Sequence, residues 1–168
     1  MTNNPERDLT SAAAGFPAAP EVSGRSLPAM SRRILVVDDE PAARVLAKRV
    51  FSEAGYEVAT VQSGFECLQL FRKQPHGFGL ILLDLSMPFM DGEETFRRLR
   101  DINPNVAVLL STGFMAQERV DRMLAAGMAG FLRKPHRPDE LLARVQAVLD
   151  EVKMSRAGCA AIDMTASI

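Results

Sequence analysis

The chain alternates between short apolar runs and longer stretches in which apolar residues recur every three or four positions. Each short run is followed by polar or turn-forming residues, a pattern typical of strands buried on both faces of a sheet. The longer stretches have the period of helices that bury one face. From about residue 33 the alternation of strand and helix repeats five times, which predicts parallel strands joined by helical crossovers.

The boundaries of these elements follow from the apolar runs and the breakers between them. The first helix has Pro41 in its first turn and Gly55 after its end, which is the usual placement of these residues, and Ser63 is a candidate cap for the second helix. The predicted strands are at 34–37, 56–61, 80–84, 106–111 and 129–132. The predicted helices are at about 40–54, 63–74, 92–101, 116–126 and 138–152. Right-handed crossovers are compatible with several strand orders, so the pattern alone leaves the order open.

Four of the predicted strands end in residues that can carry chemistry. The first is followed by Asp38 and Asp39, the third ends in Asp84, the fourth ends in Ser111 and Thr112, and the fifth leads to Lys134. Ligands of open α/β sheets bind beyond the carboxyl ends of the strands. We therefore expect three carboxylates, a hydroxyl and an amine to meet at one edge of the sheet.

Three neighbouring carboxylates disfavour joint ionisation and call for a cation, and oxygen ligands favour Mg²⁺, with Mn²⁺ as a possible substitute. Mg²⁺ keeps several waters and commonly binds phosphate as well, which indicates phosphoryl chemistry. A carboxylate can itself be the nucleophile and form an aspartyl phosphate. The Thr112 hydroxyl and the Lys134 ammonium would then neutralise charge on the transferred group.

These residues, in this order, resemble the receiver domain of two-component response regulators, of the chemotaxis-regulator type. The resemblance covers roughly Ser31 to Val152. It implies a flavodoxin-like α/β fold in which five helices surround a five-stranded parallel sheet of strand order 2-1-3-4-5.

The resemblance also implies a role for each site residue. Asp84 would be the phosphoacceptor, and Asp39, Asp84 and the backbone carbonyl of Ser86 would bind the metal, with Asp38 acting mainly through metal-bound water. Thr112 and Lys134 would contact the phosphoryl group, and the Lys134–Pro135 bond would be cis.

Further positions concern switching and the lifetime of the signal. By the same resemblance, Thr112 and Phe131 would move together on phosphorylation, while Ser86 and Phe114 would neighbour the water that hydrolyses the acyl phosphate. The apolar Phe114 cannot orient that water by hydrogen bonding, so slow self-dephosphorylation is expected.

Each of these residues also has a purely structural interpretation. Asp39 or Glu40 could cap the first helix, and Asp84 and Thr112 could be ordinary turn and strand-exit residues. Lys134 could be a solvated charge and Phe131 a core residue. His136 is interpreted as a loop residue rather than a second phosphoacceptor, because the sequence shows no carboxylate partner beside it.

In the first helix the apolar arc is broader than one buried face needs. We therefore predict that its part nearest Asp84 docks a helical phosphodonor, together with Met87, Phe89, Pro135 and His136 from the loops.

Composition narrows the remaining possibilities. A net charge of -1 and 47% apolar residues give no sign of direct DNA or membrane binding, and two cysteines, Cys67 and Cys159, form no disulfide framework. Cys67 is expected in the core and the protein in the cytoplasm. Residues 1–30, rich in Ala, Pro, Ser and Gly, are predicted to be a disordered arm, residues 31–152 the receiver domain, and 153–168 a flexible tail.

The favoured function is a phosphorelay receiver without an output domain. It would take a phosphoryl group from a histidine kinase or histidine phosphotransfer protein onto Asp84 and then change its contacts with an unknown downstream protein. It would be no enzyme beyond catalysing its own phosphorylation and dephosphorylation. Two alternatives are a Mg²⁺-dependent phosphohydrolase, which would need a general acid where Ser86 stands, and a receiver-like scaffold that is never phosphorylated.

Overall fold

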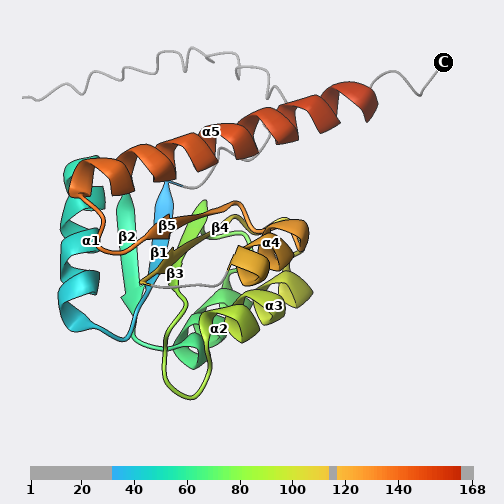
Figure 1. The fold of residues 1–168 in the computed structure, drawn as a ribbon. Helices are drawn as coiled ribbons and strands as arrows, with labels where there is room; N and C mark the ends of the chain where they lie inside the picture. Colours follow the sequence, from blue (N-terminus) through green and yellow to red (C-terminus); the bar gives the residue numbers. More distant parts are fainter. Residues whose placement is uncertain (1–31, 114–116, 164–168) are drawn as a thin grey trace, which may run out of the picture.

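The computed structural model describes residues 32–113 and 117–163, excluding the side chains of 117 and 156–163 (Figure 1). The predicted arm at 1–30 and Phe114 lie outside the described residues. The elements are β1 (Arg33–Val37), α1 (Pro41–Glu53), β2 (Glu57–Val61), α2 (Gly64–Lys73), β3 (Leu80–Asp84), α3 (Gly92–Ile102), β4 (Val108–Thr112), α4 (Gln117–Ala125), β5 (Gly130–Arg133) and α5 (Pro138–Asp163).

The strands form one parallel sheet in the order β2-β1-β3-β4-β5, so the predicted flavodoxin-like fold is confirmed. In register, Val37 lies opposite Leu83, and Asp84 lies opposite Ser111. Thr112 is opposite Arg133, immediately before Lys134. The pairing therefore brings the polar strand ends to the same edge of the sheet.

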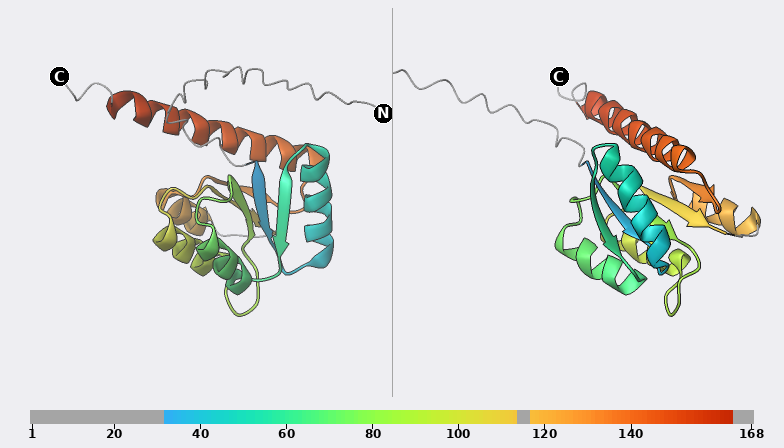
Figure 2. Two further views of the ribbon diagram at one scale, coloured as in Figure 1. Left: turned by 180° about the vertical axis from the view of Figure 1, so that it is seen from behind. Right: turned by 90° about the vertical axis from the view of Figure 1, so that its left-hand side faces the viewer.

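Helices cover both faces of the sheet, with α1 and α5 on one face and α2, α3 and α4 on the other (Figures 1 and 2). On the first face, alternate residues of β1 and β3 pack against Phe51 of α1 and Leu141 and Val145 of α5. On the second, the other residues of the same strands pack against Phe71 of α2 and Phe96 of α3. Both faces of these strands are buried, which explains their continuous apolar runs.

Side-chain caps fix the beginnings of α2 and α3. The Ser63 hydroxyl accepts a hydrogen bond from the Glu66 backbone N–H, so the predicted cap is confirmed. Asp91 does the same for Glu94 at the start of α3. Glu40 precedes α1 without a side-chain cap bond, and Pro41 occupies the first turn as predicted.

The last helix differs from its prediction. It was predicted to end near Val152 and be followed by a flexible tail, but α5 continues to Asp163 and projects past the sheet (Figure 1). The prediction ended the helix where its apolar stripe ended. The extension is rich in alanine, which has the strongest intrinsic helix propensity, so a helix can persist there without a packing stripe.

The predicted core position of Cys67 is confirmed: the side chain is completely buried in α2, and burial raises the pKa of its thiol to about 12. Of the helices described here, none combines the length and hydropathy needed to cross a membrane.

Candidate phosphoacceptor site

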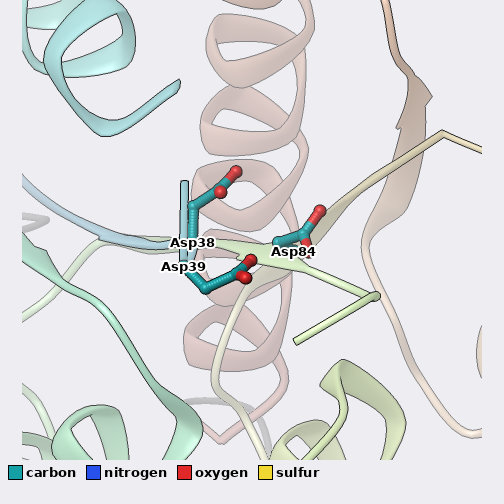
Figure 3. A group of neighbouring side chains, drawn as sticks. All are labelled: Asp38, Asp39 and Asp84. Carbon is teal, nitrogen blue, oxygen red and sulfur yellow. The ribbon is translucent and has the colours of Figure 1, made fainter. Parts of the chain in front are cut away.

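Three carboxylates meet at the carboxyl edge of the sheet, as Figure 3 shows. Asp38 and Asp39 follow β1, and Asp84 ends the neighbouring strand β3. One oxygen of each lies within 4.8 Å of the others. Asp38 and Asp84 are 5% and 4% exposed, whereas Asp39 is open to solvent. This cluster was predicted from the strand ends alone.

Lys134 joins the cluster from the loop after β5. Its Nζ donates to Asp38 Oδ2 at 2.7 Å and to Asp84 Oδ1 at 2.8 Å. Its backbone N–H donates to the Thr112 carbonyl at 2.7 Å, and the Lys134–Pro135 peptide bond is cis, as the resemblance implied. Lys134 is thus held on both its backbone and its side chain, and it is not a solvated charge.

The two charges shift each other's proton affinity. Burial raises the pKa of the Asp84 carboxyl, and the Lys134 ammonium only partly offsets this. Burial also pulls the pKa of Lys134 down, but hydrogen bonds to Asp38 and Asp84 outweigh it and the net shift is upward. Lys134 therefore stays protonated and supplies a fixed positive charge beside the carboxylates.

Backbone groups orient the carboxylates. The Ser86 N–H donates to Asp84 Oδ2, and the Glu40 N–H donates to Asp38 Oδ1, each at 2.9 Å. Arg44 of α1 donates to the Asp38 backbone carbonyl at 2.6 Å, a contact that the sequence analysis did not predict. Asp38, rather than Asp39 or Glu40, receives the bond at the entry to α1, so the capping interpretation of Asp39 and Glu40 finds no support.

The turn after Asp84 is tightly packed. A Cβ on Gly92 would lie 2.4 Å from the Asp84 carbonyl oxygen and 2.8 Å from Leu85 Cα, so only glycine fits against this backbone. The Gly92 N–H donates to the Leu85 carbonyl at 2.9 Å. Phe89, in the same turn, is completely exposed and has a positive φ of 66°.

At the end of β4, Thr112 is buried with 2% exposure. The Ser111 hydroxyl lies 3.2 Å from His136 Nε2, and this contact was not predicted. Phe131 is half-buried and packs against the cluster on the α2–α4 side of the sheet. Ser86 is exposed beside Asp84.

A pocket of about 480 Å³ adjoins the carboxylates between α1, α5 and the sheet. Asp84, Lys134, Ser111 and His136 line its polar part, and α1 residues line much of the rest. This pocket could not be predicted from the sequence, because it depends on the spacing of elements that are remote in the chain.

The donor set fits a hard divalent cation. Three carboxylates supply oxygen atoms close enough to share one ion, and a metal that prefers oxygen ligands, such as Mg²⁺, suits such a set.

Fold and site together define a flavodoxin-like α/β domain with an acidic centre at the carboxyl edge of its sheet. The family model of the response regulator receiver domain matches residues 34–146, and the chain belongs to this family.

Individual relatives agree with this assignment. The chain is 37% identical over 129 residues to the response regulator MprA of Mycobacterium ulcerans, an alignment that covers 74% of this chain and 53% of MprA, so the chain spans about half the length of that relative. It is 30% identical to sporulation initiation phosphotransferase F of Bacillus subtilis, over 71% of this chain and 95% of that protein.

A solved structure of the chemotaxis protein CheY4 from Vibrio cholerae superposes with a TM-score of 0.65 and 33% identity, covering 71% of this chain and 99% of CheY4. The prediction of a response regulator receiver is confirmed.

Proposed function

We propose that Asp84 accepts a phosphoryl group from a phosphohistidine donor, a histidine kinase or a histidine phosphotransfer protein. The observation that carries this proposal is the buried Asp84 carboxylate, which one ammonium and two further carboxylates surround. An aspartate oxygen would attack phosphorus while the bond to the donor breaks, giving an aspartyl phosphate. The site has positively charged or hydrogen-bonding groups for the negative charge that develops on the phosphoryl oxygens during transfer.

Asp39, Asp84 and the Ser86 carbonyl would hold Mg²⁺, or Mn²⁺ in its place, and Asp38 would act through water. The ion would neutralise charge on the phosphoryl oxygens. Lys134 supplies a second positive charge from the loop after β5, already within hydrogen-bond distance of Asp84. The Thr112 hydroxyl would bind the phosphoryl group from the neighbouring strand.

Phosphorylation would also be the switch. It adds about -1.5 to -2 charges and three acceptor oxygens, which favours a conformer with the Thr112 hydroxyl drawn toward Asp84. Phe131, half-buried against the core on the α2–α4 side, would follow it inward. The resulting change would alter contacts of α4, β5 and α5 with a downstream protein. Ser86 and Phe114 would set the lifetime of the phosphorylated state.

The donor would dock on the exposed side of α1 beside the site. Val45 and Leu46 are 69% and 42% exposed, and Phe89 and Pro135 are exposed around the same edge. Met87 was predicted to be part of this docking surface. Its side chain is only 6% exposed and packs in the core, so Met87 does not belong to the surface. A charged residue at Leu46 would slow transfer from the donor without affecting transfer from a small phosphodonor.

The decisive experiment is intact mass spectrometry after incubation with Mg²⁺ and acetyl phosphate. We expect one phosphate adduct on the wild type, none on Asp84→Asn, and one on the matched control Asp150→Asn, an exposed carboxylate of α5. An adduct that persists in Asp84→Asn would overturn the assignment of Asp84, and no adduct on any protein would favour the scaffold alternative. Repeated turnover of p-nitrophenyl phosphate would favour the phosphohydrolase instead.

A further inference from the structure

The pocket beside the phosphoacceptor is larger and more apolar than the binding of a phosphoryl group requires. Its volume of about 480 Å³ lies in the range of small-molecule sites, while a phosphoryl group on Asp84 would occupy only its polar end. The pocket runs from Asp84 and Lys134 into the layer between α1 and α5.

Small side chains on α1 create this space. Ala42, Ala43 and Ala47 line one wall, and Leu82 of β3 and Leu141 of α5 lie at its apolar end. Leu46, also in the lining, is 42% exposed. The apolar part is therefore open enough to admit a molecule from solvent and bordered by groups that gain from contact with it.

One polar group in the lining lacks a partner. His136 Nδ1 is buried and makes no hydrogen bond with the described residues, while Nε2 faces the Ser111 hydroxyl. In the tautomer in which Nε2 accepts from Ser111, Nδ1 carries the proton and is a donor. This donor is not accessible to solvent, so the features of the pocket that a ligand meets are its apolar walls and its Asp84–Lys134 end.

The chemistry of Asp84 limits which ligand would use all of these features. An aspartyl phosphate is a mixed anhydride of a carboxylic and a phosphoric acid, so a donor of similar transfer potential is required. Acyl phosphates meet this requirement, and they also carry a carbonyl oxygen and an acyl group. The acyl group would reach the apolar part of a pocket whose polar end is Asp84 itself.

We propose that this pocket binds the acyl group of acyl phosphates, so that the protein favours small phosphodonors with a bulky apolar acyl part. This rests on the proposed function of Asp84. In the step, an Asp84 oxygen forms a bond to phosphorus, the bond from phosphorus to the acyl oxygen breaks, and the leaving group departs as a carboxylate that keeps the bonding electron pair. No oxidant or further reactant takes part.

The test compares benzoyl phosphate with acetyl phosphate, by the rate of phosphate adduct formation on the full chain in Mg²⁺. The intrinsic reactivities of the two phosphodonors cancel when the ratio of their rates is compared between the wild type and a variant. The variants are Ala43→Leu, which fills the pocket, and Ala42→Leu, an exposed lining position at which the fold tolerates a larger residue. The control is Ser52→Leu, exposed on the same helix and outside the lining.

We expect the benzoyl-to-acetyl ratio to fall about tenfold in Ala43→Leu, because the added side chain occupies the volume of the phenyl ring, and to fall in the same direction in Ala42→Leu. The ratio of Ser52→Leu should equal that of the wild type. Ratios in both pocket variants within twofold of the wild type would overturn the proposal.

A binding measurement separates this proposal from that of Asp84 as acceptor. Benzoylphosphonate, whose carbon–phosphorus bond cannot transfer the phosphoryl group, should bind the wild type and Ser52→Leu and bind Ala43→Leu about tenfold more weakly, followed by NMR shifts of methyl groups lining the pocket. Absence of an Asp84-dependent adduct together with this binding pattern would refute only the phosphoacceptor assignment. Absence of binding to the wild type would refute the acyl pocket.

Discussion

The turns that leave the neighbouring strands β3 and β4 differ in how closely they are packed. At the first, a Cβ on Gly92 would collide with the backbone of Asp84 and Leu85. At the second, a Cβ on Gly113 would meet no atom of the described residues within 4 Å. One glycine is therefore required by a close backbone contact, whereas the other, directly after Thr112, has no such contact among the described residues.

The same contrast extends to the helices that follow. α3 begins with the Asp91 cap and buries Thr95, Phe96 and Leu99. Among the described side chains of α4, Val120 and Met123 are buried, and Arg119 pairs with Asp91 at 2.7 Å and with Glu93. Asp84, the proposed phosphoacceptor, thus stands before a closely packed turn, whereas Thr112, the proposed switch residue, is followed by a glycine with no close contact among the described residues.

Substituting alanine for each of the two glycines in turn gives the largest expected difference in the free energy of unfolding. Gly92→Ala should lower the free energy of unfolding by about 3 kcal/mol, because its methyl group has only backbone atoms to displace. Gly113→Ala should change it by no more than about 0.5 kcal/mol. Urea unfolding followed by circular dichroism measures both, and equal losses would show that the two turns are not different.

The Asp91 carboxylate contributes to both helices. Asp91→Ala should cost about 1–2 kcal/mol, because the Glu94 N–H loses its cap and Arg119 loses a partner. Asp91→Ser keeps a capping oxygen but not the ion pair, so it should recover most of the loss in the same urea experiment. If Asp91→Ser recovered none of the lost stability, the ion pair with Arg119 would contribute more to stability than the cap does.

Arg119 tests how firmly α4 is attached. Arg119→Gln should cost at most about 1 kcal/mol, since the side chain is partly solvated, but hydrogen exchange should accelerate in α4 and remain unchanged in α3. The control is Arg97→Gln, which removes an exposed pair with Glu94 inside α3 and should leave exchange in α4 unaltered. Equal acceleration of hydrogen exchange in α3 and α4 after Arg119→Gln would show that the Arg119 ion pairs do not act on α4 alone.

The smallest expected effect is on the pH dependence of the free energy of unfolding, and it arises from His136 beside Ser111 of β4. Burial, aided by the charge of Lys134, lowers the pKa of His136 below its usual 6.5. The unfolded chain then binds the proton more readily, so stability should fall as pH decreases from 6.5 through the lowered value, and the loss should be absent above 6.5. Unfolding of wild type and His136→Gln from pH 4 to 8 measures it, and parallel curves would exclude a contribution from His136.

The strand ends account for most of what the sequence predicted. Asp38, Asp39, Asp84 and Lys134 meet because parallel strands deliver their carboxyl ends to one edge, a rule that needs no knowledge of the contacts. The strand order needed the family resemblance, because right-handed crossovers alone allow several orders.

What the sequence did not predict depends on spacing between remote elements. The pairing of Arg119 with Asp91 spans 28 positions and that of Ser111 with His136 spans 25, and neither leaves a periodic trace in the chain. Met87 was misassigned to a surface because its position in a loop suggested exposure, whereas its side chain fills the core below that loop.

Burial of Cys67 also gives the protein an internal chemical reporter. Alkylating reagents react with thiolates, and a completely buried thiol with a pKa of about 12 presents almost none to solvent at neutral pH. Modification of Cys67, located by peptide mapping, therefore proceeds only through opening of the core between α2 and the sheet. The rate at which this thiol is labelled therefore reports how often that part of the core opens. It can be measured in mixtures in which optical signals overlap.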